Sequence, residues 1–258
     1  MIALAANWLR QCLRGGGLSA GGRSALRAVW VGPAMLVVMS GTAQAQAYQC
    51  RMPERVSVPR IAPEAGERRV PITGYTLALS WAPEFCKPRE GDRRHAMQCG
   101  GRNGRFGLVV HGLWPEGRST WPQWCRTPRS VSPVEARRNL CMMPSANLIS
   151  RQWAKHGSCM ARTPEGYFKA TRLLHGSLRL PDYDRLSRED GLNAGRVREA
   201  FVIANPAWKP EMIGIRLNQR GWLEELRLCY GKDFMPARCN ARQLGARDKA
   251  SVKIWRGL

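Results

Sequence analysis

The sequence lacks several features that mark other protein classes. It contains no internal repeat and no low-complexity tract, so neither a repeat architecture nor a compositionally biased chain is indicated. Its apolar run from Ala28 to Met39 is shorter than the roughly 20 residues that cross a bilayer. No two of its nine cysteines have the close spacing of a zinc ribbon. We therefore expect neither a membrane-spanning segment in the mature chain nor a metal or other cofactor.

Acidic residues are scarce. The 258 residues include 41 Lys and Arg but only 19 Asp and Glu, which gives a formal net charge of +22. Such an excess favours a polyanionic partner, namely nucleic acid, an anionic membrane surface or an acidic polysaccharide. The positive residues are spread along the chain, so the charge by itself is weak evidence.

The first 47 residues have the pattern of a secretory signal peptide. Their only charged side chains are four arginines, and the apolar run is followed by small residues at alternating positions. Cleavage after Ala45 or Ala47 fits equally well, and subtracting the four arginines from +22 leaves +18. A buried N-terminal helix is the alternative, but Gly15–Gly17 and Gly32–Pro33 disfavour it. We expect an exported protein, periplasmic or extracellular.

The cysteine count supports export. Removing the leader removes Cys12 and leaves an even number of cysteines, as four disulfides require. Free thiols would be the alternative in a reducing cytosol. Eight cysteines allow 105 pairings; they are Cys50, Cys86, Cys99, Cys125, Cys141, Cys159, Cys229 and Cys239.

Patterning after the leader predicts strands, then helices, then strands again. Residues 48–70 are predicted to be an extended arm pinned by Cys50, and the Cys86–Cys99 segment an exposed loop. The expected strands are Tyr75–Trp81, Phe106–Val110, Glu211–Leu217 and Trp222–Tyr230, with a last edge strand at Ser251–Trp255. The expected helices are Ser145–His156, Thr163–His175 and Asn193–Ala204. This order predicts a single α+β domain over residues 48–258, with a central antiparallel sheet flanked by helices and stapled by disulfides.

Two histidines are the strongest candidates for chemistry. His111 is predicted to end a buried strand, a rigid mounting, with Gly112 letting the backbone turn sharply. His156 is predicted to lie in the last turn of a helix, where the helix dipole would raise its pKa. Two imidazoles and a cation such as Lys155 are the minimum set of groups for phosphoryl transfer without a metal.

The helix before Gly157 arranges further candidates. Gln152 and His156 are four residues apart and share one face, while Arg151 and Lys155 share the neighbouring face. Trp153 is expected to point inward. Cys159 can tether the helix, with Cys125 as one candidate partner.

Structural roles are the alternatives for several of these side chains. A single histidine at a strand end is more often a hydrogen-bonded structural residue than a catalyst, so His111 alone could be either, and His95 and His175 are weaker candidates. Lys155 alone could be a solvated helix residue. Trp114, Trp121 and Trp124 could be core residues or could stack on bases, and for Trp114 we favour the core.

The segments His111–Pro115 and Lys155–Cys159 resemble the two active-site segments of the T2-type ribonucleases. Leu79–Cys86 and Leu226–Cys239 are also similar to that family, so the resemblance covers nearly all of the chain after the leader. It implies an endoribonuclease that cleaves single-stranded RNA by transphosphorylation, without a metal, and leaves a 2′,3′-cyclic phosphate.

The resemblance also implies roles and disulfides. His111 and His156 would be the acid–base pair, with His111 protonating the leaving 5′-oxygen and His156 taking the 2′-hydroxyl proton, and Lys155 would stabilise the phosphorane. The sequence itself leaves open which histidine does which. The implied disulfides are Cys86–Cys99, Cys125–Cys159 and Cys229–Cys239, which leaves Cys50 for Cys141.

The chain departs from the family pattern at one point. Where the pattern has His-Glu, this sequence has Arg151 and Gln152. Arginine can contact a phosphate, and glutamine can donate a hydrogen bond but cannot accept a proton. We keep Gln152 as a catalytic candidate and Arg151, Trp114 and Trp153 as candidates for substrate contact, and expect a reduced rate or a shifted pH optimum.

Two other functions compete with this one. A cationic protein that binds RNA or an anionic surface, with weakened or lost catalysis, is the main alternative. Metal-dependent hydrolysis is weaker, because two histidines without a third ligand do not make a catalytic zinc site. For the enzyme we expect single-stranded RNA as substrate, no DNA specificity and a monomer.

Overall fold

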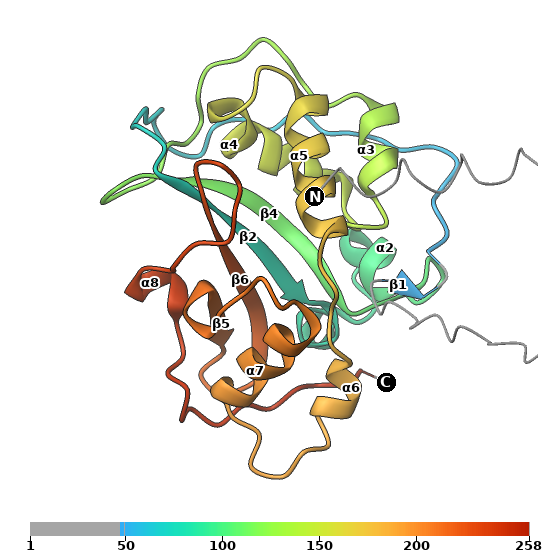
Figure 1. Cartoon of the computed structure of the whole chain (residues 1–258). Coiled ribbons are helices and arrows are strands. Elements are labelled where there is room, and N and C mark those ends of the chain that lie inside the picture. Colours follow the sequence, from blue (N-terminus) through green and yellow to red (C-terminus); the bar gives the residue numbers. More distant parts are fainter. Residues whose placement is uncertain (1–46, 49, 258) are drawn as a thin grey trace, which may run out of the picture. The chain divides into compact units, whose positions relative to one another are not determined.

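A computed structural model describes residues 47–48 and 50–257. The predicted signal peptide therefore lies outside the described residues, apart from Ala47. The centre of the fold is a four-stranded antiparallel sheet with the order β4-β2-β6-β5 (Figure 1). Its strands are β2 (Gly74–Trp81), β4 (Leu108–Glu116), β5 (Ile213–Leu217) and β6 (Leu223–Gly231). A separate pair joins β1 (Ala47–Tyr48) to β3 (Arg105–Phe106).

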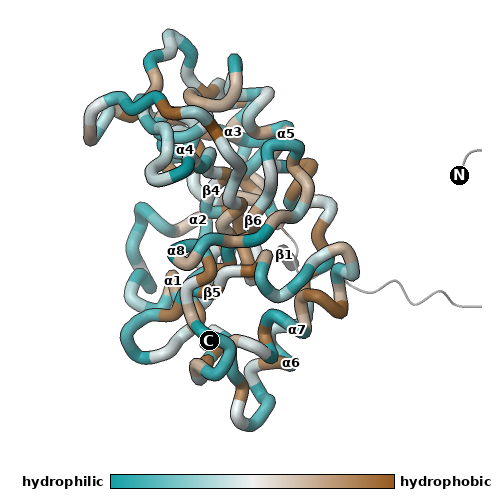
Figure 2. Tube along the Cα trace, turned by 60° about the vertical axis from the view of Figure 1, so that its left-hand side comes forward, coloured by the Kyte–Doolittle hydropathy of each residue, from teal (hydrophilic) through white to brown (hydrophobic). Residues whose placement is uncertain are grey.

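The middle of the sheet is covered on both faces. Leu77, Ala78 and Leu79 on β2 are fully buried although neighbours along a strand point to opposite faces. Continuous apolar runs are typical of strands that lie between two layers. In Figure 2 the hydrophobic segments run through the middle of the trace, around β4, β6 and β5, and much of the periphery is hydrophilic.

Helices form two groups beside the sheet (Figure 1). The group that contacts β4 and β2 consists of α3 (Pro133–Asn139), α4 (Ala146–Lys155) and α5 (Pro164–Gly176). The group near β5 consists of α6 (Tyr183–Leu186), α7 (Ala194–Ala204) and α8 (Ala241–Leu244), with a 3-10 turn, η4, at Pro210–Met212. No helix within the described residues is both long and apolar enough to cross a membrane.

Capping residues explain where the predicted helices begin. The side chains of Ser145, Thr163 and Asn193 each accept a hydrogen bond from the backbone N–H three residues on, at the starts of α4, α5 and α7. These three helices confirm the expected ones. The short helices α3, α6 and α8 were not predicted, because at four to seven residues they show little periodicity.

Three local predictions are wrong. The strand expected at Phe106–Val110 divides into β3 and β4, and β4 continues to Glu116. The Cys86–Cys99 segment is largely exposed and is closed by a disulfide, as expected, but it consists of short helical turns rather than a loop: η1 (Lys87–Arg89), η2 (Arg93–His95) and α2 (Ala96–Cys99), preceded by α1 (Ala82–Cys86). Ser251–Trp255 makes only isolated bridges, at Ser251 and Lys253, rather than an edge strand.

Four disulfides close the chain on itself. The pairs are those that the resemblance implies: Cys50–Cys141, Cys86–Cys99, Cys125–Cys159 and Cys229–Cys239. The first pins the arm to the body, as expected. Residues 50–70 contain no helix or strand. A β-bridge from Arg68 to Gln123, a hydrogen bond from Arg68 Nε to Trp121 O and an ion pair of Glu67 with Arg126 tie their far end to the loop after β4.

Candidate active site

His111 occupies a β-bulge in the middle of β4. Ala78 on β2 pairs with Gly112 and Leu79 pairs with Val110, so His111 is the extra residue without a partner on β2. The expectation that His111 ends its strand is wrong, because β4 runs on past it. A bulge re-aims one side chain while the ladder on either side holds its base rigid. The imidazole is 39% exposed and lines a cavity.

A buried carboxylate orients that imidazole. His111 Nδ1 lies 2.7 Å from Oε2 of Glu225 on β6, and Arg227 Nε donates to Glu225 Oε1 at 2.9 Å. Burial raises the pKa of Glu225, but the hydrogen bonds and positive charges of His111 and Arg227 outweigh it and hold the pKa below its ordinary value. With Nδ1 engaged, the Nε2 side of His111 is left for the cavity.

Gly112 has a different role from the one predicted. It sits within the strand, and its lack of a side chain allows the end of Gln152 to approach the sheet. A Cβ at position 112 would lie 2.1 Å from Gln152 Oε1 and 2.5 Å from Trp114 Nε1. In that space Trp114 Nε1 donates to Gln152 Oε1 at 2.9 Å. Because Oε1 accepts this bond, the Gln152 amide nitrogen is the group available to the cavity.

His156 is the C-cap of α4 and is 7% exposed. Burial, followed by the charges of Lys155, His111 and Arg151, lowers its pKa to about 3. The predicted rise from the helix dipole is therefore wrong, because loss of solvent and neighbouring cations both disfavour the imidazolium. Its Nδ1 is buried without a hydrogen-bond partner among the described residues.

Lys155 and Arg151 extend from the same helix toward this cavity. Burial and the charges of Arg151 and Arg68 lower the pKa of Lys155. Arg151 forms an ion pair with Glu64 of the N-terminal arm and lies over the ring of Trp124, 5.9 Å from its centroid. The arm therefore already provides a partner for one of the cations expected to contact substrate.

The tryptophans divide between core and cavity. Trp114 is half-buried and lies between the two catalytic candidates, its ring centroid 5.2 Å from that of His111 and 5.8 Å from that of His156. The core position favoured for Trp114 is thus wrong. Trp153 is 2% exposed and its Nε1 donates to Arg129 O at 2.9 Å, so it cannot contact substrate. Trp121 lines the cavity, whereas Trp124 is buried.

The candidates share one cavity of about 430 Å³. Deep in it, Thr76 Oγ1 donates to Glu116 Oε1 and accepts from Gln243 Nε2, both at 2.8 Å. A second cavity of about 570 Å³ adjoins the first, since both are lined by His111, Trp114, Arg216 and Arg227. The first cavity is lined by Thr76, His111, Trp114, Glu116, Trp121, Arg151, Gln152, Lys155, His156, Arg216, Arg227, Arg242 and Gln243.

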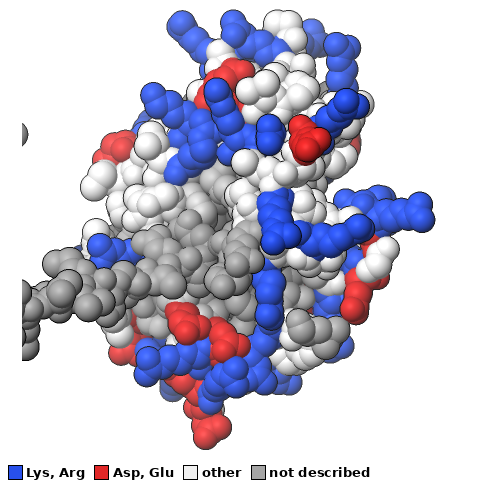
Figure 3. Space-filling model, turned by 90° about the vertical axis from the view of Figure 1, so that its right-hand side faces the viewer, with Lys and Arg blue, Asp and Glu red and all other residues white. Residues whose placement is uncertain are grey.

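Positive charge dominates the first cavity but is not confined to it. Its lining contains five Lys and Arg residues against Glu116 as the acid. Another face, in Figure 3, also carries more Lys and Arg than Asp and Glu over its described part. The local excess is what a phosphodiester substrate would require, while the general excess would attract a polyanion from a distance.

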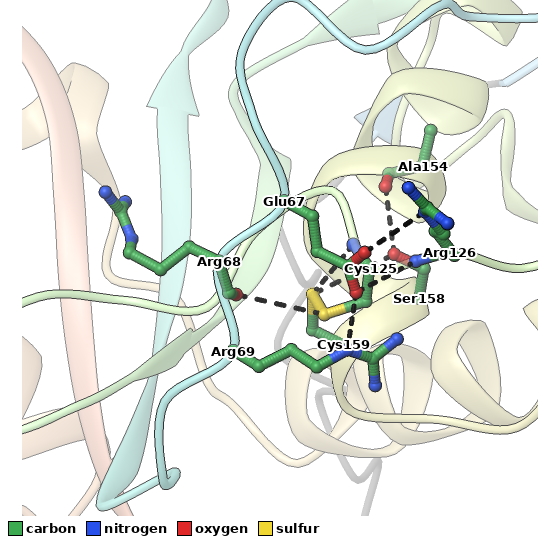
Figure 4. A network of polar contacts seen from close by, with 8 residues as sticks. All are labelled: Glu67, Arg68, Arg69, Cys125, Arg126, Ala154, Ser158 and Cys159. Atoms are coloured by element: carbon green, nitrogen blue, oxygen red, sulfur yellow. Dashed lines mark hydrogen bonds and ion pairs between the residues drawn. A yellow bond between two sulfur atoms is a disulfide. The ribbon is translucent and has the colours of Figure 1, made fainter.

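The Cys125–Cys159 disulfide fixes the end of α4 to the loop after β4 (Figure 4). The backbone N–H of Cys125 lies 3.2 Å from Cys159 Sγ, and Ser158 Oγ donates to Ala154 O at 2.9 Å. Arg68 of the arm passes beside this bridge, with its carbonyl toward Cys125 Sγ. These contacts hold Lys155 and His156 beside the sheet that bears His111.

Several residues of the site escaped sequence reasoning. Glu225, Arg227, Arg216 and Arg242 reach it from strands or a short helix whose relation to His111 depends on the sheet order. Glu116 lies on β4 itself, beyond the point where that strand was expected to end. The one available signal was the alternation of β6, which places Glu225 and Arg227 on the same face of that strand.

The other two histidines lie apart from the site. His175 is buried in α5 at 6% exposure, and His95 lies 4.0 Å from Asp92 in the segment closed by Cys86–Cys99. Neither lines the cavity that holds His111 and His156. His111 and His156, the two candidates favoured from the sequence, thus line one cavity, whereas His95 and His175 lie elsewhere.

Comparison with known proteins agrees with this geometry. The family model described as the ribonuclease T2 family matches residues 73–190, which include both histidine segments. The chain belongs to the ribonuclease T2 family. A probable ribonuclease of Haemophilus influenzae is 31% identical to this T2-family chain over 186 residues, 67% of this chain and 63% of that protein. A ribonuclease of Aeromonas hydrophila is 36% identical over 96 residues, 37% of this chain and 40% of that protein.

Solved structures share the T2 fold. Trichomaglin, described as a novel S-like ribonuclease, matches with a TM-score of 0.57 at 22% identity, covering 71% of this chain and 97% of that one. An RNase-related protein from Calystegia sepium matches with a TM-score of 0.54 at 20% identity, covering 70% and 96%. The chain thus has the T2 fold, although it spans less than two thirds of the two bacterial relatives described above.

Proposed function

We propose that this T2-family chain is an endoribonuclease that cleaves single-stranded RNA by transphosphorylation and leaves a 2′,3′-cyclic phosphate. The observation that carries the proposal is that His111, His156 and Lys155, from two different elements, line one cationic cavity. Transphosphorylation needs a group that removes a proton, a group that supplies one and a cation for the phosphorus oxygens. The cavity offers all three.

His156 is the general base in this scheme. It takes the proton of the 2′-hydroxyl as that oxygen attacks phosphorus. An imidazole can accept a proton only when it is neutral, and a pKa lowered to about 3 keeps His156 neutral in mildly acidic and neutral solution. The buried position that lowers the pKa also restricts the ring to one orientation.

His111 is the general acid. It gives a proton to the 5′-oxygen as the phosphorus–oxygen bond to it breaks, so one imidazole gains the proton that the other loses. Glu225 stabilises the positive charge of the protonated ring and fixes its direction through the 2.7 Å contact with Nδ1. Arg227 keeps Glu225 ionised by donating to its other oxygen.

Lys155 and Gln152 stabilise the phosphorane between these two steps. Lys155 supplies a positive charge, and the Gln152 amide nitrogen donates to a non-bridging oxygen. The bond from Trp114 to Oε1 holds the amide in that orientation. Glutamine in place of glutamate thus removes a proton-accepting group and provides a donor. Replacing Gln152 by glutamate tests whether the proton-accepting group or the hydrogen-bond donor matters more for the rate.

A cleavage assay on purified, fully oxidised protein tests the proposal. Single-stranded RNA should be cut in the presence of EDTA, and the products should carry cyclic phosphate ends. His111→Ala and His156→Ala should each lower kcat/KM by at least a hundredfold, since general acid–base groups contribute about 10²–10⁴-fold. If the double variant equals the parent in every assay, RNA or surface binding is the function; sensitivity to the chelator would favour metal-dependent hydrolysis.

We also infer export, with residues 1–47 as signal peptide. The support is the cysteine usage, because all eight cysteines of the described residues are paired and disulfides persist in oxidising compartments. N-terminal sequencing of the protein recovered from cell fractions should find a start after Ala45 or Ala47. A start at Met1 would contradict the inference.

A further inference from the structure

Two tryptophans and a lysine form a cluster outside the catalytic cavity. Trp222 precedes β6 and Trp255 lies near the C-terminus, and their ring centroids are 6.0 Å apart in an edge-to-face arrangement. Lys87 Nζ lies 3.9 Å from the centroid of Trp255 and 5.1 Å from that of Trp222. Lys253 Nζ lies 5.9 Å from Trp222. Such distances are those of cation–π contacts.

This cluster is not part of the hydrophobic core. Both indoles are half-buried, and neither belongs to the core or to the residues packed against it. Within the described residues, neither indole N–H has a hydrogen-bond acceptor. Tryptophan carries a large apolar surface and a polar N–H, and buried examples usually satisfy both. Trp222 and Trp255 therefore have ring surface and an indole N–H available to a ligand.

The cluster is continuous with the site. The cavity of about 570 Å³ begins at His111 and also contacts Lys87 and Arg220. Lys87 in turn lines a neighbouring cavity of about 310 Å³ together with Trp255. A path that includes Lys87 thus runs from the imidazole of His111 to the Trp255 indole. Trp222 lines neither cavity but lies beside Trp255 and Lys87.

We propose that Lys87, Trp222 and Trp255 form a second binding site for single-stranded RNA, which holds nucleotides beyond the scissile linkage. Bases would stack on the indoles, and Lys87, Lys253 and Arg220 would contact phosphates. The alternation of ring and cation matches the alternation of base and phosphate in a single strand. An acidic protein segment would use the cations but not the ring faces. This inference rests on the proposed function, since it concerns the same RNA.

Substrates of different length provide the test. Trp222→Ala and Trp255→Ala should each lower kcat/KM for a single-stranded 12-nucleotide RNA about tenfold, mainly through KM, because base stacking on one aromatic ring is worth about that factor or more. Cleavage of a dinucleotide, which cannot reach the cluster, should be unchanged. Trp222→Phe should restore most of the loss by restoring a ring. Lys87→Ala should also act on the long substrate only, unlike Lys169→Ala on the exposed side of α5.

Binding of an oligonucleotide that cannot be cleaved separates this inference from the proposed function. A 2′-deoxy 12-mer lacks the attacking hydroxyl, and fluorescence anisotropy can measure its affinity for each variant even if the protein cleaves nothing. The Trp222→Ala and Trp255→Ala proteins should bind it several-fold more weakly, with unchanged thermal unfolding. Equal losses on dinucleotide and 12-mer, no loss on either substrate, or displacement by an acidic peptide as readily as by the 12-mer would each overturn the proposal.

Discussion

Gly112→Ala should be far more damaging than one methyl group suggests. The new Cβ would lie 2.1 Å from Oε1 and 2.7 Å from Cδ of Gln152, and 2.5 Å from Trp114 Nε1. The strand cannot move away easily, because Gly112 pairs with Ala78, which is fully buried on the central strand β2. The end of Gln152 must therefore shift and break its hydrogen bond with Trp114.

The size of the effect follows from two contributions. Overpacking in a filled site costs about 1–3 kcal/mol, and loss of one hydrogen bond costs about 0.5–1.5 kcal/mol. The free energy of unfolding of Gly112→Ala should thus fall by about 2–4 kcal/mol, with a Tm lower by roughly 4–16 °C for a domain of this size. Misplacing the Gln152 amide should lower kcat/KM about tenfold to a hundredfold, the value of a hydrogen bond to a charged oxygen.

Thermal unfolding and RNA cleavage kinetics measure both effects. Gly176→Ala is the matched control, because a Cβ there meets nothing within 4 Å. Its activity should equal that of the parent and its stability should not fall, since Gly176 ends α5 and alanine favours a helix. In Gly112→Ala/Gln152→Ala the displaced amide is gone, so part of the lost stability should return while activity stays low. Full stability and activity of Gly112→Ala, or strictly additive effects in the double variant, would refute the reasoning.

Four other changes probe the remaining groups. Glu225→Gln keeps the shape but removes the charge beside His111, so kcat should fall about tenfold to a hundredfold with KM nearly constant; an unchanged kcat would show that the contact is idle. Glu64→Gln frees Arg151 and should lower the KM for RNA by no more than about fivefold, the value of a surface ion pair; a higher KM would contradict this. Burial lowers the pKa of His175 to about 4, so the folded protein resists a proton that the unfolded chain accepts below pH 6.5, and stability falls as the pH drops through that range. In urea unfolding, His175→Gln should make the loss of stability between pH 6.5 and 4 smaller by on the order of 3 kcal/mol. The same pH dependence in variant and parent would contradict a role of His175. Gln152→Glu should alter the pH profile of kcat/KM, and an unaltered profile would mean that the position has no catalytic role.

Local patterns predicted much of the fold and part of the site. The caps of α4 and α5 are encoded by single residues, Ser145 and Thr163, and the alternation of β2 is visible in the sequence. Their positions were therefore predictable. The motifs around His111 and His156 likewise identified the two imidazoles that line one cavity.

The rest depended on tertiary structure. The bulge at His111 exists only in the pairing of β4 with β2, and Glu225 reaches it from a strand more than one hundred residues later. The pKa of His156 was predicted with the wrong sign because helix position was visible and burial was not. Short helices such as α3 follow from packing rather than from periodicity.

The order of the strands has a consequence for biosynthesis. The sheet runs β4-β2-β6-β5, so β6, near the end of the chain, lies beside β2, near its beginning. A growing polypeptide possesses both imidazoles and Lys155 well before the ribosome reaches β6, yet until then β2 has an open edge and His111 has no carboxylate. Truncated products should accordingly be inert, and ribonucleolytic competence should arise only when nearly the whole polypeptide has been made.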